Sequence, residues 1–222
     1  MSFEPADDAA TAQGFEAANV RRSYDAVAAD YDATFGDELA GKPLDCRLLD
    51  DLVALVGTGP GTVVLDLGCG PGQVGERLAT AGTTPVGIDL APGMLAIARQ
   101  RRAAAGDLRA IPLRSASAAG AAAFYCLHHL PLPEIERALE EIRRVLEPGA
   151  PLLAATHLGE GALHATEWFG HPVCLSGACY PEDVFAGAIT GAGFTIVERH
   201  ERGPDPEEGP TQRLYLLARA PS

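Results

Sequence analysis

The chain has 222 residues, of which 47% are hydrophobic, enough to bury one full core, and its formal net charge is −13. That charge opposes binding to a phosphate backbone, so a nucleic-acid substrate is disfavoured. Five cysteines without a C-x-x-C pair, an acidic N-terminal stretch and no apolar run of membrane-spanning length predict a soluble, cytoplasmic protein with reduced thiols.

The N-terminal quarter lies outside the strand–helix alternation of the later chain. Residues 1–13 are small, acidic and aperiodic, and we expect them to be disordered. Residues 14–56 have a helical pattern, in which Tyr24 and Tyr31 fall on one face, as they would in an ordinary core stripe. We interpret Lys42 as a surface lysine rather than as a cation that contacts a ligand.

A glycine-rich turn follows the first predicted strand, at residues 62–67. Asp66 lies at the strand end, and Gly68, Gly70 and Gly72 follow at alternate positions. Glycine adopts backbone conformations that are closed to other residues and lets the chain pass close to a ligand. The pattern therefore predicts a binding turn at the end of a buried strand.

A second acidic residue, Asp89, ends the next predicted strand, at residues 85–88. In a βαβ unit an acid at this point meets the two hydroxyls of a ribose, so the two strands predict a nucleoside-cofactor site. A dinucleotide fingerprint needs a third glycine where Gln73 stands, so this pattern does not fit a dinucleotide.

The strings V-L-D-L-G-C-G-P-G and G-I-D-L-A-P-G-M-L closely resemble motifs I and II of class I S-adenosylmethionine-dependent methyltransferases. The resemblance implies an α/β fold with a doubly wound, seven-stranded, mostly parallel, Rossmann-like sheet that ends in an antiparallel hairpin. It also implies S-adenosylmethionine as cofactor and S-adenosylhomocysteine as product. The cofactor residues implied in these motifs are Asp66, Gly68, Cys69, Gly70, Gly72, Asp89, Leu90 and Met94.

The string Y-D-x-x-A-x-x-Y-D resembles the lid helix of the same family. The resemblance implies that residues 14–56 form an N-terminal helical lid. It implies that the Tyr24 hydroxyl meets the cofactor carboxylate and that Tyr31 is a second cofactor contact.

Residues 57–222 are predicted to form the Rossmann-like domain, with a cap insert near residues 158–181. A helix at 133–147 has an apolar i, i+3, i+4 face. Two last strands, at 194–199 and 213–219, are joined by a loop rich in Pro and Gly and match the expected hairpin.

The segment around Asp107 resembles the adenine site of the family. The resemblance implies that Asp107 meets the adenine amino group and that the backbone N–H of Leu108 meets a ring nitrogen. A helix expected at 94–101 is followed by poor strand material at 102–105, so the third strand is expected to be very short.

A predicted strand at 119–125 runs into L-H-H-L-P, which looks like motif IV of small-molecule methyltransferases. The resemblance implies that Phe124 and Tyr125 line the cofactor and that His128 or His129 faces the reacting centre. The alternative is that both histidines cap the next helix or lie at its surface.

Three regularly spaced histidines, His157, His164 and His171, precede Cys174 and Cys179. Their spacing matches no zinc pattern, and intervening glycines break any helix that would align them, so no metal site is predicted.

His157 ends a predicted strand at 152–156, which places it beside the cofactor. We take His157, His128 and His129 as candidate catalytic residues that contact the substrate or act as a base. Trp168 is interpreted either as a wall of the substrate site or as part of a small core within the cap.

The sequence therefore predicts an enzyme that transfers a methyl group from S-adenosylmethionine to an O, N or C nucleophile of a small molecule. It is expected to act as a monomer or homodimer, without nucleic-acid or membrane partners. The alternative is a methyltransferase-fold protein that binds S-adenosylmethionine or a metabolite without methyl transfer, as a cyclase or binding module. The N/D-P-P-Y/F step of many nucleic-acid methyltransferases is replaced by residues 126–129, and the Y-x-x-x-K motif of an oxidoreductase is absent.

Overall fold

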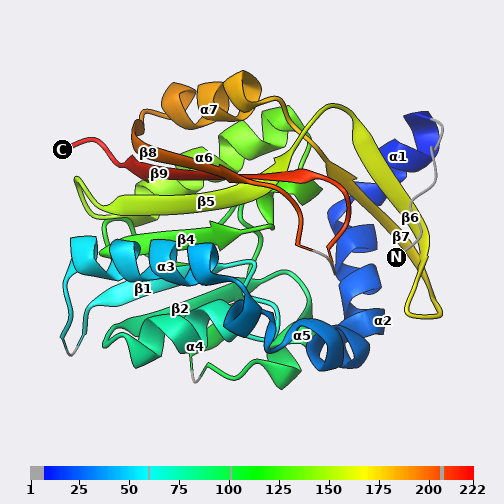
Figure 1. The fold of residues 1–222 in the computed structure, drawn as a ribbon, viewed down its shortest axis with the longest axis horizontal. Helices are drawn as coiled ribbons and strands as arrows, with labels where there is room; N and C mark the ends of the chain where they lie inside the picture. Colours follow the sequence, from blue (N-terminus) through cyan, green and yellow to red (C-terminus); the bar gives the residue numbers. More distant parts are fainter. Residues whose placement is uncertain (1–7, 60, 101, 206–207) are drawn as a thin grey trace.

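The computed structural model describes residues 8–59, 61–100, 102–205 and 208–222. Its centre is a seven-stranded sheet that has helices on both faces (Figure 1). The strands are β1 (Val63–Leu67), β2 (Thr84–Asp89), β3 (Ala103–Ala105), β4 (Gly120–Phe124), β5 (Pro151–Leu158), β8 (Thr195–Arg202) and β9 (Gln212–Arg219). They are arranged in the order β3-β2-β1-β4-β5-β9-β8, in which β9 runs antiparallel to both of its neighbours and the other pairs are parallel. The predicted doubly wound, mostly parallel sheet with a C-terminal hairpin is confirmed.

The helices beside the sheet are α3 (Pro43–Val56), α4 (Gln73–Thr80), α5 (Pro92–Ile97), α6 (Leu132–Val145) and α7 (Glu182–Gly191). Successive residues of a strand point to opposite faces, so the sheet buries both. Val64 packs with α3 and α4 on one face, while Leu65 and Leu67 pack with α6 and α7 on the other. The apolar stripe expected on the helix at 133–147 is the buried face of α6.

A second unit, which we call the cap, covers one end of the sheet. It consists of α1 (Asp8–Gly14), α2 (Ala17–Phe35) and a two-stranded sheet of β6 (Ala162–Trp168) and β7 (His171–Ala178). Figure 1 shows these elements together beyond the carboxyl ends of β1 and β4. Trp168 and Leu175 of the hairpin pack against Val27 of α2 and Met94 of α5 in a separate apolar cluster.

Three sequence expectations need correction. The N-terminal disorder expected for residues 1–13 is wrong from Asp8 onward, because α1 docks on the hairpin, where the Ser176 hydroxyl donates to the Thr11 carbonyl; residues 1–7 lie outside the described residues. The helix expected at 94–101 ends at Ile97. The expected lid at 14–56 is divided, because α2 lies in the cap whereas α3 covers the sheet.

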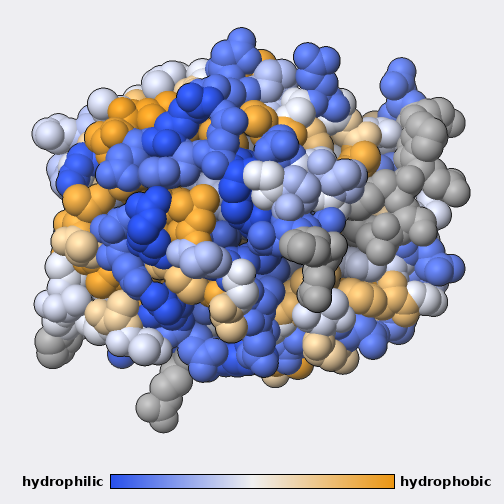
Figure 2. All heavy atoms as spheres, in the orientation of Figure 1, coloured by the Kyte–Doolittle hydropathy of each residue, from blue (hydrophilic) through white to orange (hydrophobic). Residues whose placement is uncertain are grey.

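The face of the molecule drawn in Figure 2 is mostly polar. Hydrophilic side chains cover most of the face in Figure 2, and hydrophobic ones form small patches between them. Among the described residues, the exposed large hydrophobic side chains are Leu55, Phe169 and Val197. None of the described helices has the length and apolar character needed to cross a membrane.

The cap gives a first prediction. Trp168 is 7% exposed, and its ring meets those of Tyr24 and Tyr31 edge-on at 5.8 and 5.5 Å. Trp168→Ala should lower the free energy of unfolding by about 3–5 kcal/mol, because it leaves a cavity in the cap cluster. Hydrogen exchange should accelerate in α2 and stay unchanged in β1.

Phe169→Ala, at an exposed neighbouring position, is the control and should lower the free energy of unfolding by less than about 1 kcal/mol. Equal losses of stability for the two variants in chemical denaturation would contradict this account of the cap.

Candidate functional site

The glycine turn after β1 is tied to the end of β2 by its backbone. The amides of Gly68 and Cys69 both donate to the Ile88 carbonyl, at 2.8 and 3.1 Å. Gly68 has a φ of 65°, and a Cβ there would lie 2.3 Å from the Cβ of Cys126. A Cβ at Gly70, in contrast, would meet no atom within 4 Å. The turn therefore needs glycine at its start and borders open space at its centre.

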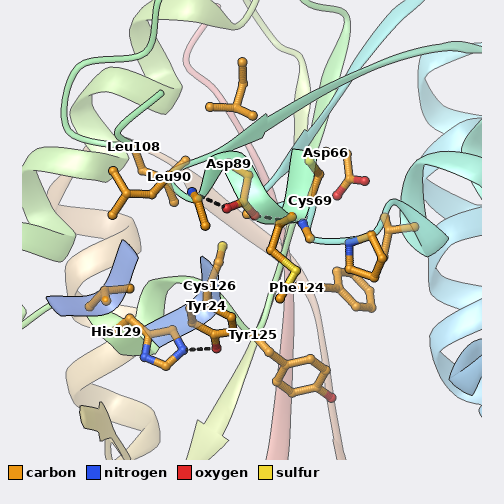
Figure 3. Close-up of a pocket in the computed structure, with 18 of the residues that line it drawn as sticks. Tyr24, Asp66, Cys69, Asp89, Leu90, Leu108, Phe124, Tyr125, Cys126 and His129 are labelled. Atoms are coloured by element: carbon orange, nitrogen blue, oxygen red, sulfur yellow. Dashed lines mark hydrogen bonds between the residues drawn. The ribbon is translucent and has the colours of Figure 1, made fainter. Parts of the chain in front are cut away.

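Asp89 is held rigidly at this turn. Its Oδ2 accepts from the amide of Gly70 at 2.8 Å, and its Oδ1 accepts from the amide of Ala91 at 2.8 Å (Figure 3). Burial raises the pKa of its carboxyl group, while these two amides lower it. The carboxylate is thus oriented before any ligand arrives.

Asp66 lies deeper, 2% exposed, and accepts from the amide of Gly75 at 2.9 Å. Burial, with the charge of Asp89 nearby, raises the pKa of Asp66 to about 8. Near neutral pH this carboxyl group is therefore mainly protonated and carries a donor as well as acceptors.

A cavity lies above the turn, and we call it the cofactor cavity. The predicted residues that line it are Tyr24, Tyr31, Asp66, Gly68, Cys69, Gly70, Asp89, Leu90, Met94, Asp107, Leu108, Phe124 and Tyr125, together with His129. Gly72 does not line it; its amide donates to the Cys69 carbonyl at 2.9 Å, and it precedes α4 with a φ of 90°. The structure brings the other predicted residues together, and their contacts with a ligand stay predictions.

Asp107 lines the cofactor cavity and is already paired with Arg109. The guanidinium of Arg109 donates to both of its carboxylate oxygens, at 2.9 and 2.6 Å, and also contacts Glu134. Hydrogen bonds from Arg109 hold the pKa of Asp107 below its usual value. An adenine amino group at Asp107 would share this carboxylate with Arg109.

Tyr24 and His129 form one hydrogen-bonded pair. His129 Nδ1 lies 2.7 Å from the Ser176 carbonyl, which accepts only, so the proton is on Nδ1. His129 Nε2 therefore accepts from the Tyr24 hydroxyl, at 2.6 Å (Figure 3). Burial lowers the pKa of His129 to about 4, so the imidazole is neutral near pH 7. The hydroxyl expected to meet the cofactor carboxylate thus has His129 as its partner in this structure.

A second cavity, the acceptor cavity, adjoins the first. It is lined by His128, His129 and His157 together with rings of the cap, including Trp168. The His128 ring centroid lies 3.9 Å from that of His129 and 4.9 Å from that of His157. His128 is 8% exposed, and no described residue is a hydrogen-bond partner of its Nδ1. The alternative of a surface position is therefore wrong for His128, and the alternative of a helix cap is wrong for both, because no side chain in the described part of the chain caps α6.

His157 is held from the side of β9. Its Nδ1 lies 2.8 Å from the hydroxyl of Thr211, which also accepts from Arg213 at 2.7 Å. Burial, followed by the charge of Arg213, lowers the pKa of His157 to about 4. The acceptor cavity thus contains clustered imidazoles that are mainly uncharged near pH 7.

Tyr125 forms part of the wall of both cavities. Its φ of 51° is in the left-handed region, which costs a non-glycine residue about 1–2 kcal/mol. Its hydroxyl lies 2.7 Å from that of Tyr215, and Tyr215 donates in turn to Asp45 at 3.0 Å. This strained residue at the end of β4 therefore places an aromatic ring between the two cavities.

The other two regularly spaced histidines, His164 and His171, do not line either cavity. His164 Nδ1 pairs with the Ser176 hydroxyl at 2.9 Å, and His171 Nε2 lies 2.9 Å from an Asp30 carboxylate oxygen. Within the described residues, no three His, Cys, Asp or Glu side chains are grouped to hold a metal ion.

Sequence reasoning missed a buried ionic cluster at the rim of the acceptor cavity. Glu208 lies 2.9 Å from Lys42, 2.6 Å from Arg202 and 3.2 Å from Arg213. The Lys42 side chain is only 11% exposed, so its interpretation as a surface lysine is wrong. The burial of Asp45, which lies near Arg202, could have been predicted from the sequence, because Asp45 falls on the apolar face of α3.

Part of the chain matches known methyltransferases in sequence. Residues 64–149 match the family described as "Methyltransferase domain". The malonyl-[acyl-carrier protein] O-methyltransferase of Serratia marcescens is 34% identical over 145 residues, which cover 62% of this chain and 54% of that protein. The demethylmenaquinone methyltransferase of Renibacterium salmoninarum is 34% identical over 140 residues, covering 61% and 57%. The chain thus spans little more than half the length of these curated relatives.

Solved structures with the same fold cover almost the whole chain. The 1,6-didemethyltoxoflavin-N1-methyltransferase of Burkholderia thailandensis, solved with S-adenosylhomocysteine, has a TM-score of 0.74 at 22% identity and covers 99% of this chain and 95% of its own. The [4+2]-cyclase SpnF has a TM-score of 0.68 at 21% identity, covering 92% and 97%. At these identities the likeness shows the fold alone.

The histidine cluster gives a second prediction. The folded-state pKa values of His129 and His157 lie near 4, below the usual value of about 6.5. In NMR titrations their ring resonances should stay those of neutral imidazole down to about pH 5, whereas the urea-unfolded chain should titrate near 6.5.

The lowered pKa values of these histidines also make the stability of the fold depend on pH. Because the unfolded chain takes up these protons first, the contribution of both groups to stability falls as the pH drops from about 6.5 towards 4. His157→Gln should therefore reduce the stability lost over that interval. Ring resonances of the folded protein that titrate near 6.5 would show that the imidazoles are not desolvated.

Proposed function

We propose that the chain is a class I S-adenosylmethionine-dependent methyltransferase, as motifs I and II and the match of residues 64–149 support, and that it transfers a methyl group to a small-molecule acceptor. The observation that carries the proposal is the wall shared by the two cavities. Tyr24, Tyr31, Tyr125 and His129 line both, so a ligand in one cavity lies against a ligand in the other. Direct transfer between two bound molecules requires this arrangement.

The residues of the cofactor cavity fit S-adenosylmethionine. The open space at Gly70 admits a ligand close to the backbone, and the fixed Asp89 carboxylate suits the ribose hydroxyls. Asp107 and Leu108 would hold the adenine, while Phe124 and Tyr125 would border the methionine part. When bound, the cofactor supplies a methyl group that its sulfonium already activates.

The chain's own contribution is alignment of the acceptor and exclusion of water. α2 and the β6–β7 hairpin cover the cavities, and Tyr24, Tyr31 and Trp168 pack edge-on between them. We assign α2 and this hairpin the role of a lid, in place of the whole segment 14–56. Holding two reactants in line is worth up to about 7–11 kcal/mol of the barrier.

The acceptor is a compact, partly apolar molecule that carries a hydroxyl, amine or carbon-acid group. Aromatic rings and neutral imidazoles line the acceptor cavity, and its cations Lys42 and Arg213 are already paired with Glu208. The demethylmenaquinone relative, whose acceptor is named as a quinone-type molecule, supports testing aromatic acceptors first. The malonyl carrier-protein relative makes carboxylates the second class to test.

A histidine assists when the acceptor arrives protonated. His128 has a buried Nδ1 with no partner among the described residues, and the ring of His157 contacts it edge-on at 4.9 Å. Burial holds the pKa of both well below the ordinary value, so each is neutral near pH 7 and can accept a hydrogen bond from the acceptor, although the same shift makes it a weak base. His129 is less suited to this role, because both of its ring nitrogens already have partners.

Cofactor binding gives a third prediction. Asp89→Asn should weaken the binding of S-adenosylhomocysteine by about 10–100-fold in calorimetry, because a charge-assisted hydrogen bond to the ribose is lost. Asp51→Asn, on the exposed side of α3, is the matched control and should bind like the wild type. If the two variants bind equally well, Asp89 is not the ribose site.

Turnover gives a fourth prediction. Release of S-adenosylhomocysteine should appear with one class in a panel of phenols, quinols, amines, carbon acids and carboxylates. With the acceptor found in this way, His128→Ala should lower kcat by about 10²–10⁴-fold and leave cofactor affinity unchanged. His200→Ala, on β8, is the control.

Other results would change the mechanism or the function. Full activity of His128→Ala and of His157→Ala would leave alignment alone as the mechanism. Binding of S-adenosylhomocysteine without release from S-adenosylmethionine with any acceptor would favour the cyclase or binding-module alternative.

A further inference from the structure

A buried carboxylate at the start of α3 has one oxygen with no partner. Asp45 is 1% exposed; its Oδ2 accepts from the Tyr215 hydroxyl at 3.0 Å and lies 3.5 Å from Arg202 Nε. Its Oδ1 is buried and has no hydrogen-bond partner among the described residues, and Asp45 lines the cofactor cavity. A buried charged oxygen without a donor is costly, so a ligand is the expected source of that donor.

Gln73 gives the same cavity a second unpartnered acceptor. It begins α4, and its Oε1 is also buried without a partner among the described residues. Its Nε2 donates to Glu38 at 3.4 Å, and Glu38 pairs with Lys42 at 2.6 Å. Lys42 is further paired with Glu208, and it acts on Asp45 through its charge. This part of the cavity therefore presents two acceptors without a partner among the described residues, one of which belongs to a carboxylate.

Asp45 of α3 is hydrogen-bonded to a different part of the sheet from the residues expected to hold the nucleoside. Asp89 follows β2, whereas Asp45 is held by Tyr215 of β9. The strands β1, β4 and β5 lie between β2 and β9, so the two carboxylates approach the cavity from opposite sides. A cofactor with its ribose at Asp89 would have to extend across the ends of β1 and β4 for its methionine part to reach Asp45.

We propose that Asp45 Oδ1 and Gln73 Oε1 bind the positively charged α-amino group of the cofactor's methionine part. The inference rests on the proposed function and adds residues outside the motifs that predicted it. An ammonium group offers three donors and no acceptor, which matches two unpartnered acceptors beside a negative charge. Tyr215 and Arg202 act as positioning residues, because they hold the carboxylate through its other oxygen.

Calorimetry with three ligands tests this assignment. The ligands are S-adenosylhomocysteine, its analogue without the α-amino group, and 5′-methylthioadenosine, which lacks the whole amino-acid part. The wild type should bind S-adenosylhomocysteine about 10–100-fold more tightly than the deaminated analogue. Asp45→Asn should lose that preference by binding S-adenosylhomocysteine more weakly while its affinity for the analogue stays unchanged.

Two further measurements keep the test decisive. Unchanged binding of 5′-methylthioadenosine shows that Asp45→Asn is folded and keeps its nucleoside site. Gln73→Met removes the second acceptor without touching a charge, and it should cost about 3–10-fold in affinity for S-adenosylhomocysteine alone.

Three results would overturn the assignment. If Asp45→Asn binds all three ligands more weakly by the same factor, then Asp45 only neutralises the charge of Arg202 and does not contact the amino group. Unchanged affinities in both variants would place the amino group elsewhere. A wild type that binds none of the three ligands would instead remove the proposed function, and the inference with it.

Discussion

The carbonyl oxygen of Ile88 fixes the geometry on which the site depends. It accepts from two consecutive amides at the end of β1, and the parallel pairing of Leu67 with Ile88 brings the two strand ends to the same level. The glycine turn is thereby held against β2, which lets the amide of Gly70 reach Asp89. A shift in this register would separate the turn from the carboxylate and remove the floor of the cofactor cavity.

Around that floor the protein buries polar groups that a structural core would exclude. Asp66 is protonated by burial, the imidazole of His129 is kept neutral, and one oxygen of Asp45 has no partner among the described residues. Each such group lowers the stability of the fold, and such groups concentrate at functional sites. The aromatic cluster of the cap compensates by burying apolar rings over the same region.

The sequence predicted what short-range patterns encode. The β-branched strand, the alternate glycines and the strand-end Asp89 lie close together in the chain, so their juxtaposition follows from one βαβ unit. The apolar residues of α6 recur at helical spacing, which likewise predicts only an amphipathic helix with one buried face. Lys42 was misread because its partner Glu208 lies at the far end of the chain. α1 was missed because docking on the hairpin, rather than intrinsic periodicity, makes Asp8–Gly14 helical.

The hydrogen bond between Asp45 and Tyr215 joins residues 170 positions apart. A ribosome makes the glycine turn and Asp89 long before it makes β9, because domains are synthesised from the N-terminus. Until β9 emerges, Asp45 has neither Tyr215 nor Arg202 paired to it across the hairpin, and one edge of β5 is unpaired. If Asp45 holds the amino-acid half of the pocket as proposed, that half is completed only after β9 has joined the sheet. A ligand that spans both halves would then favour the fold with β9 in place over earlier intermediates.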